Sequence, residues 1–182
     1  MKKTVFYILR LSMTLLLITA LAAGALAAVN NITKDAIAEN KLAKTRAALA
    51  EVLPGAENMA VIDNGSGTVK AVYAPGADSP VQGWAVEVAP GSGFGGEIRM
   101  MVGIDTDGKV VGISIITHAE TPGLGAVAAA KTPAGETFRD SFLGDSGNLS
   151  LGDIDALSGA TITSKAVLEG VNAALAYVAN LD

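Results

Sequence analysis

The sequence predicts an α+β domain, an antiparallel sheet covered by helices, preceded by one N-terminal transmembrane helix. Three observations lead to this fold class: a long apolar stretch lies near the N-terminus, segments with strand character follow it, and most helical segments come after the strands. Strands followed by helices are typical of α+β domains, whereas a doubly wound fold alternates the two. The 182 residues suit one globular domain with an appendage.

Residues 1–30 are expected to form a short cytoplasmic tip and a transmembrane anchor. The stretch 11–33 carries no charge, and Lys2, Lys3 and Arg10 precede it. About 20 apolar helical residues cross the hydrocarbon core of a bilayer, and flanking basic residues stay in the cytoplasm. We therefore expect a single-pass protein of the cell (inner) membrane, with a cytoplasmic N-terminus and an extracytoplasmic main domain. A cleavable signal peptide is the alternative, because 25–27 (Ala-Leu-Ala) resembles a cleavage site.

The segment 31–53 is predicted to be a helical stalk, because its apolar residues recur at helical intervals and Pro54-Gly55 follows. Later segments rich in Val and Ile, bounded by Gly, Pro or Asp, predict strands. Asp107-Gly108 is a tight-turn signal, so the strands on either side of it should form an antiparallel hairpin. The predicted strands are 68–73, 83–89, 97–104 and 109–117, and helices are expected near 125–131, 137–143 and 163–179.

Charge and composition exclude several classes of function. The net charge of −5 includes +3 from the first ten residues, so the rest of the chain carries −8 and has no basic patch for nucleic acid. The absence of cysteine excludes disulfides and thiolate metal sites. No group of His, Asp or Glu has metal-ligand spacing, and the single histidine, His118, is read as a loop residue. We therefore expect neither a metal site nor a catalytic side chain.

The segment 155–164 places a small, hydroxyl-bearing loop directly before the C-terminal helix. The first N–H groups of a helix have no intrahelical acceptor and carry a partial positive charge, so an anion is stabilised there. Gly159 and Ala160 leave room for close approach, and Thr161 offers a hydroxyl beside the anion. Thr163 or Ser164 is expected to cap the helix. The segment therefore predicts a phosphate site.

These residues also carry a resemblance. Asp155, Ser158, Gly159, Ala160 and Thr161 match the flavinylation motif Asp-x-x-Ser/Thr-Gly-Ala-Thr of the FMN-binding subunits of the Rnf and sodium-translocating NADH:quinone oxidoreductase complexes. The resemblance implies covalent FMN, joined through its phosphate to Thr161 by a transferase that takes FMN from FAD. It also implies that Asp155 serves in recognition by that transferase, and that 54–182 is an extracytoplasmic FMN-binding domain.

A second segment, 118–125, follows the predicted hairpin and is rich in turn residues. Gly123 and Gly125 allow a ligand to approach the backbone, and Glu120 and Thr121 supply an acceptor and a hydroxyl. Residues 120–125 match the Glu-Thr-Pro-Gly-Leu-Gly segment that helps form the flavin pocket in the same family. The resemblance therefore predicts these cofactor-binding residues: Glu120, Thr121, Gly123, Leu124, Gly125, Ser158, Gly159, Ala160, Thr161 and Thr163.

Other candidates are kept out of the predicted site. Trp84, Phe94 and Tyr73 can pack against a flavin ring, but aromatic residues in alternating strands usually belong to the core. The turn at 93–96 resembles a structural glycine–aromatic turn of the family. Lys165 is one turn beyond Thr161, and we read it as a solvated helix position.

The compact chain is similar to the G-subunit of the Rnf complex. This resemblance implies a membrane-anchored electron carrier, without turnover of its own, in a translocase coupling ferredoxin:NAD electron transfer to sodium or proton transport. Its partners would be the other membrane and peripheral subunits, the flavin transferase and the bilayer. The alternatives are the C-subunit of the quinone reductase, another extracytoplasmic FMN electron-transfer protein, and a non-redox anchored scaffold or binding module.

Overall fold

The computed structural model describes residues 2–56 and 58–181, with the side chains of Lys2, Lys3 and Val5 outside the description. The predicted orientation in the membrane depends in part on Lys2 and Lys3, whose side chains lie outside the described residues. The chain divides between Ala43 and Lys44 into two compact units.

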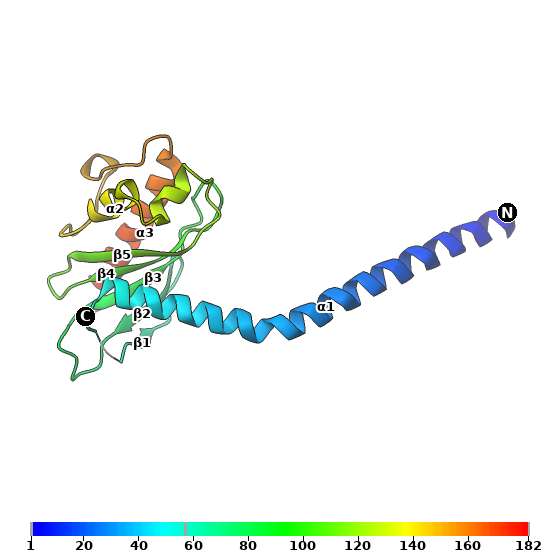
Figure 1. Cartoon of the computed structure of the whole chain (residues 1–182), viewed down its shortest axis with the longest axis horizontal. Helices are drawn as coiled ribbons and strands as arrows, with labels where there is room; N and C mark the ends of the chain where they lie inside the picture. The colour runs from blue at the N-terminus through cyan, green and yellow to red at the C-terminus, as the bar shows by residue number, and fades with distance from the viewer. Residues whose placement is uncertain (1, 57, 182) are drawn as a thin grey trace. The chain divides into compact units, whose positions relative to one another are not determined.

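Helix α1 (Lys2–Val52) continues without a break from the predicted anchor through the predicted stalk (Figure 1). Among the described residues it is the one helix long and apolar enough to cross a membrane. Two hydroxyls of its apolar part are satisfied within the helix, since Thr14 donates to the Leu11 carbonyl at 2.8 Å and Thr19 to the Leu15 carbonyl at 2.9 Å. Such internal bonds are what a helix in lipid requires. The division into anchor and stalk stays a prediction.

The second unit contains one five-stranded antiparallel sheet in the order β1-β2-β3-β4-β5. Its strands are β1 (Ala60–Asp63), β2 (Val69–Ala74), β3 (Trp84–Val88), β4 (Arg99–Ile104) and β5 (Val110–Thr117). The predicted fold class and all four predicted strands are confirmed, and β1 is an additional short edge strand. The β4–β5 turn forms as predicted, because Asp105 Oδ1 accepts the N–H groups of Asp107 and Lys109, both at 2.9 Å, and Gly108 takes φ 75°.

Helices α2 (Pro133–Asp140) and α3 (Thr161–Val178) lie on one face of this sheet (Figure 1). The core on that face includes Val86, Val88, Met100 and Val102, which are fully buried. Gly170 allows α3 to approach closely, since a Cβ there would overlap Met100 Cε and lie 3.1 Å from Val88 Cγ2. Two short 3-10 turns, η1 (Gly125–Ala129) and η2 (Leu151–Asp153), connect the elements.

The predicted helix positions need correction. The helix expected at 137–143 is α2, which begins four residues earlier because Thr132 caps it and Pro133 occupies its first turn. The helix expected at 125–131 is the 3-10 turn η1. The C-terminal helix begins at Thr161 instead of residue 163.

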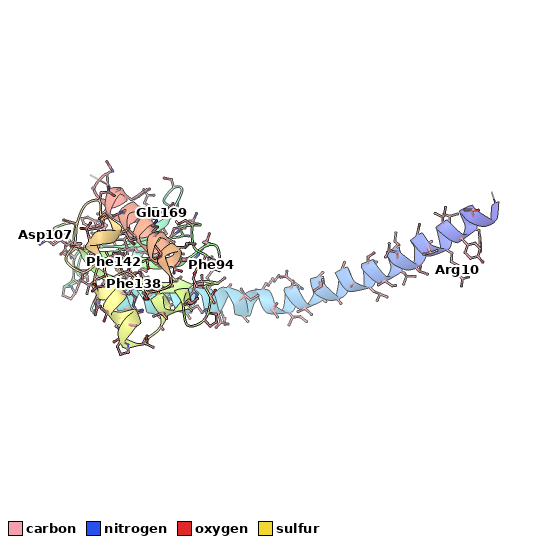
Figure 2. All side chains as sticks on the ribbon, turned by 90° about the horizontal axis from the view of Figure 1, so that it is seen from above. Arg10, Phe94, Asp107, Phe138, Phe142 and Glu169 are labelled. Atoms are coloured by element: carbon pink, nitrogen blue, oxygen red, sulfur yellow. The ribbon has the colours of Figure 1, made fainter. Side chains whose placement is uncertain are left out.

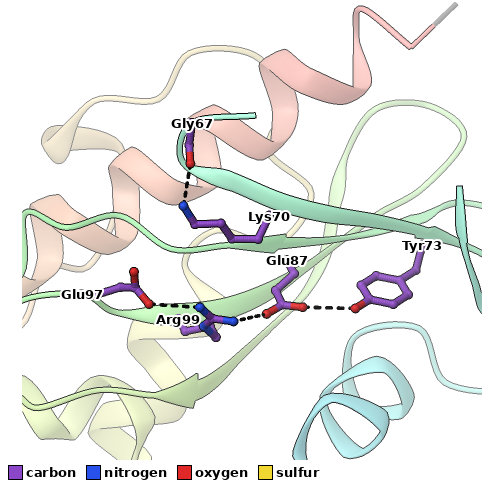
Figure 3. A network of polar contacts seen from close by, with 6 residues as sticks. All are labelled: Gly67, Lys70, Tyr73, Glu87, Glu97 and Arg99. Carbon is purple, nitrogen blue, oxygen red and sulfur yellow. Dashed lines mark hydrogen bonds and ion pairs between the residues drawn. The ribbon is translucent and has the colours of Figure 1, made fainter. Parts of the chain in front are cut away.

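The last turns of α1 cover the opposite face of the sheet. Val52 is fully buried, and a Cβ on Gly103 would lie 2.5 Å from the Val52 carbonyl oxygen. On the same face, Glu87 is buried and accepts hydrogen bonds from Tyr73 at 3.1 Å and Arg99 at 2.9 Å (Figure 3). Burial, followed by the charge of Glu87 and its hydrogen bond, raises the pKa of Tyr73 to about 12. Both faces of the sheet are therefore covered, and the candidate site lies at one end of it.

Candidate functional site

The two sequence segments singled out above meet in one pocket of about 300 Å³. It lies where the N-terminus of α3 meets the loop after β5 and the glycine turn before β4. The predicted site residues that line it are Glu120, Thr121, Leu124, Gly125, Gly159, Ala160, Thr161 and Thr163, and Phe94 and Ile162 complete it. Gly123, Ser158 and Asp155 are exposed nearby and do not line it. Segments that are far apart in the sequence thus form a single cavity.

Thr161 is the first residue of α3, and its side chain is exposed. Gly159, with φ 73°, turns the chain directly before it, a left-handed conformation that glycine adopts without strain. The first N–H groups of α3 have no acceptor one turn earlier, and no acidic side chain lies in its first turn. An exposed hydroxyl next to these donors fits a phosphate ester, because the helix terminus stabilises the phosphate charge.

The predicted cap on α3 is wrong, because neither Thr163 nor Ser164 accepts an N–H of the first turn. The N-cap is Ala160, which has no side-chain cap. Ser164 is fully buried and braces the preceding loop instead, since its Oγ accepts the Leu157 N–H at 3.0 Å and donates to the Ala160 carbonyl at 3.1 Å. These bonds fix the segment that carries Thr161.

Thr163 and Glu120 form the buried base of the pocket. The Thr163 hydroxyl donates to Glu120 Oε2 at 2.6 Å, and the Gly95 N–H donates to Glu120 Oε1 at 2.9 Å. Glu120 is 6 % exposed and Thr163 is 2 % exposed. Hydrogen bonds to an ionised group are stronger than neutral ones, and a buried carboxylate depends on them. One side chain therefore joins α3, the loop after β5 and the glycine turn.

Glycine is required where these segments touch. A Cβ on Gly125 would overlap Glu120 Oε2 and Thr163 Oγ1, and a Cβ on Gly95 would overlap the Ala119 carbonyl oxygen. Gly125 is therefore needed for packing around the Glu120–Thr163 bond. The sequence instead led us to expect that Gly125 lets a ligand approach the backbone closely. Gly123 is exposed at φ 76° and serves the turn.

Sequence reasoning placed Phe94 in the core, and this assignment is wrong. The Phe94 ring is 69 % exposed and lines the pocket. Trp84 and Tyr73, the other two aromatic candidates, are only partly exposed and lie away from this pocket. The signal available in the sequence was the four-residue turn 93–96, whose three glycines leave Phe94 no strand in which to be buried.

Three further polar residues of these loops, His118, Ser150 and Asp153, have structural partners. His118 Nδ1 accepts the Glu120 N–H at 3.2 Å, as a loop residue would. Ser150 and Asp153 form a capping box ahead of the motif, and the Ser150 hydroxyl and N–H hold the pKa of Asp153 below its usual value. Within residues 2–56 and 58–181, no three His, Asp or Glu side chains form a metal-binding group.

Comparison with known proteins shows which families this sequence matches. Residues 93–176 match the FMN-binding domain family, and residues 1–52 match the RnfG N-terminal region. The G-subunit of the sodium-translocating ferredoxin:NAD oxidoreductase complex of Acetobacterium woodii is 34 % identical over 96 % of this chain and 93 % of its own length.

Two further relatives agree with these matches. The G-subunit of the ion-translocating oxidoreductase complex of Shewanella amazonensis is 33 % identical over 85 % of this chain and 80 % of its own. The G-subunit of the proton-translocating ferredoxin:NAD oxidoreductase complex of Clostridium ljungdahlii is 43 % identical over 50 % of each chain. The chain therefore belongs to the Rnf G-subunit family of redox-complex proteins, and its pocket lies within an FMN-binding domain.

Proposed function

We propose that this protein is a membrane-anchored electron carrier whose FMN is bonded covalently to Thr161. It would act in an Rnf-type complex that couples ferredoxin:NAD electron transfer to sodium or proton translocation. The observation that carries the proposal is the exposed Thr161 hydroxyl at the N-terminus of α3, on the wall of a pocket within the FMN-binding domain.

The attachment is a phosphoryl-group transfer from FAD. Thr161 Oγ1 forms a bond to the phosphorus on the FMN side, the diphosphate P–O bond breaks, and AMP leaves while the hydroxyl proton is released. No electron is gained or lost in this step. The exposed hydroxyl leaves room for the transferase, and Asp155 is exposed six residues earlier, where that enzyme would recognise it.

The bound FMN would supply one- and two-electron redox chemistry. The protein would position it: the free N–H groups of α3 would hold the phosphate, and Leu124 and Ile162 offer apolar surface at 47 % and 51 % exposure. A covalent carrier stays near its neighbouring redox centres. Because the pocket is at the small end of the usual range for ligands, about 300–1,000 Å³, part of the flavin would stay accessible to a partner.

The attachment test compares Thr161→Val with Thr161→Ser and with Thr117→Val, an exposed control at the end of β5. The chain is produced with a flavin transferase and run on a denaturing gel under ultraviolet light. Wild type, Thr161→Ser and Thr117→Val should fluoresce, and Thr161→Val should not. Peptide mass analysis should place FMN, less one water, on residue 161. A non-fluorescent wild-type band would refute covalent attachment and favour the scaffold alternative.

Recognition by the transferase is tested with Asp155→Asn. This change removes a charge at an exposed position without altering side-chain volume. Attachment to folded Asp155→Asn protein should be slower than to wild type, measured as gel fluorescence against time at limiting transferase. Equal rates would remove Asp155 from the proposed recognition.

The topology is tested by cysteine labelling, which the natural absence of cysteine makes clean. Ala77 lies in the loop between β2 and β3 and is exposed, and Thr4 lies near the start of α1. A membrane-impermeant thiol reagent should label Ala77→Cys on cells with an opened outer envelope and label Thr4→Cys only after the inner membrane is disrupted. The reverse pattern would refute the proposed orientation.

The complex is tested by identifying the subunits that purify with the chain. A ferredoxin-oxidising partner set supports the Rnf assignment, whereas a quinone-reducing set supports the C-subunit alternative. The name of the Acetobacterium woodii relative gives sodium as the translocated ion, and the name of the Clostridium ljungdahlii relative gives protons. Ferredoxin-driven transport by membrane vesicles, with and without sodium, distinguishes the two ions.

A further inference from the structure

We infer that Phe94 is the aromatic surface on which the isoalloxazine ring of the attached flavin stacks. The inference rests on the proposed FMN at Thr161 and adds to it the residue that orients the ring. It starts from an exposed phenyl side chain that the sequence patterns alone did not assign to the cofactor.

Phe94 stands apart from the other aromatic residues of the second unit. Phe138 and Phe142 are buried in the core and are labelled together with Phe94 in Figure 2. Their rings pack edge to face, with centroids 5.5 Å apart. Tyr73 bonds to Glu87, and Tyr177 bonds to Asp63 at 2.9 Å. Among the described residues, Phe94 is the only aromatic side chain that lines the pocket containing Thr161.

Exposed apolar groups concentrate at this pocket. In the described part of the second unit, seven large hydrophobic side chains are exposed, and Phe94, Leu124 and Ile162 all line the pocket. Phe94 is the most exposed of the seven. A cluster of exposed apolar side chains marks a binding surface, whereas scattered ones need no explanation. A planar aromatic ligand suits this cluster because aromatic rings prefer offset or edge-to-face contact with one another.

The backbone holds Phe94 in a fixed position. Gly93 and Gly96 form a bridge in which the Gly96 N–H donates to the Gly93 carbonyl at 3.2 Å. The Gly95 N–H donates to the buried Glu120, and Gly95 packs directly on Ala119. Because the backbone of this turn is constrained, the Cα of Phe94 is held beside the pocket without a ligand, and such pre-organisation favours binding.

Glu120 also sets the spacing between the two ends of the proposed cofactor site. Its two oxygens bond to Gly95, next to Phe94, and to Thr163, two residues beyond Thr161. The ring surface and the attachment hydroxyl are therefore joined through a single buried carboxylate. This connection explains why an exposed phenyl group and an exposed threonine share one pocket.

The test uses flavin fluorescence, because tryptophan and tyrosine in contact with a flavin quench its emission by electron transfer, whereas phenylalanine does not. Phe94→Trp is compared with Val61→Trp, an exposed position on β1 outside the pocket. Both are full-length chains in detergent, matured with the transferase. Phe94→Trp should show native emission several-fold below wild type, Val61→Trp should match wild type, and all three should emit equally once denatured.

Phe94→Leu provides the complementary measurement. Loss of the stacking surface should lower the fluorescence anisotropy and the visible circular dichroism of the native flavin, with attachment unchanged on the denaturing gel. Equal native emission in Phe94→Trp and Val61→Trp, or unchanged signals in Phe94→Leu, would overturn the inference while leaving the covalent bond intact. A wild-type gel band without flavin would overturn the attachment itself. Phe94→Tyr repeats the quenching comparison with a ring close to the natural size.

Discussion

The Thr163–Glu120 hydrogen bond gives the sharpest test of the site's architecture, because the same substitution two residues away is its control. Thr163→Val keeps the side-chain shape and removes the donor to Glu120 Oε2, a bond of 2.6 Å between two buried groups. A hydrogen bond to a charged group contributes about 1.5–3 kcal/mol, and leaving a buried charge unsatisfied costs a similar amount. We expect Thr163→Val to lower the free energy of unfolding by about 2 kcal/mol.

Thr161→Val should behave in the opposite way. Thr161 is exposed and has no partner within the described structure, so its loss should change stability by no more than about 0.5 kcal/mol. It should nevertheless abolish flavin attachment. The pair thus separates a residue that holds the pocket together from the residue proposed to carry the cofactor.

The measurement is urea unfolding of flavin-free chains, produced without the transferase so that the cofactor does not contribute. Trp84 is the single tryptophan and is half-buried at the start of β3, so its fluorescence reports on the second unit. A double-mutant cycle with Glu120→Gln should give a coupling energy of at least about 1 kcal/mol. Equal unfolding midpoints for Thr163→Val and Thr161→Val would refute the argument that this bond stabilises the pocket.

Two further predictions concern the opposite face of the sheet. With a pKa raised from 10 to about 12, Tyr73 contributes stability that is present below pH 10 and is lost as the pH rises to about 12. An ultraviolet titration, in which the signal of Tyr73 is assigned by the difference from Tyr73→Phe, should show the raised pKa. Glu87→Gln should lower the midpoint of the Tyr73 titration. Gly103→Ala should cost about 1–3 kcal/mol in urea unfolding, because its Cβ would lie 2.5 Å from the Val52 carbonyl oxygen, whereas Gly91→Ala, with no atom within 4 Å, should unfold like wild type.

Local signals in the sequence were sufficient for most of the fold. The Asp107-Gly108 turn determined the β4–β5 hairpin, and the periodic C-terminal segment predicted α3 to within two residues at its start. Strand β1 was missed because its four residues, Ala-Val-Ile-Asp, do not alternate between apolar and polar side chains. In the structure this edge strand is mostly exposed. Helix α2 was placed too late because its start depends on the Thr132–Pro133 cap and not on its apolar spacing.

The candidate site was predictable in its segments but not in its contacts. Thr163 looked like a helix cap because Ser and Thr usually cap nearby N–H groups, but its acceptor is Glu120, 43 residues earlier. Phe94 looked like a core residue because it was read as part of an alternating strand, although the glycine turn around it was a local signal against burial. For Thr163 the deciding partner is remote in sequence, and a pattern read along the chain carries no information about it.

The hydrogen bonds of Glu120 show that the pocket can form before a flavin binds. Both carboxylate oxygens bond to the protein itself, one to Gly95 and one to Thr163, so the buried charge is satisfied without a cofactor. The pocket is therefore a property of the folded chain. The Thr161 side chain, in contrast, is exposed to solvent and makes no such bond. Under the proposed function, a transferase would therefore act on a folded domain in which the pocket is already formed and the Thr161 side chain is exposed.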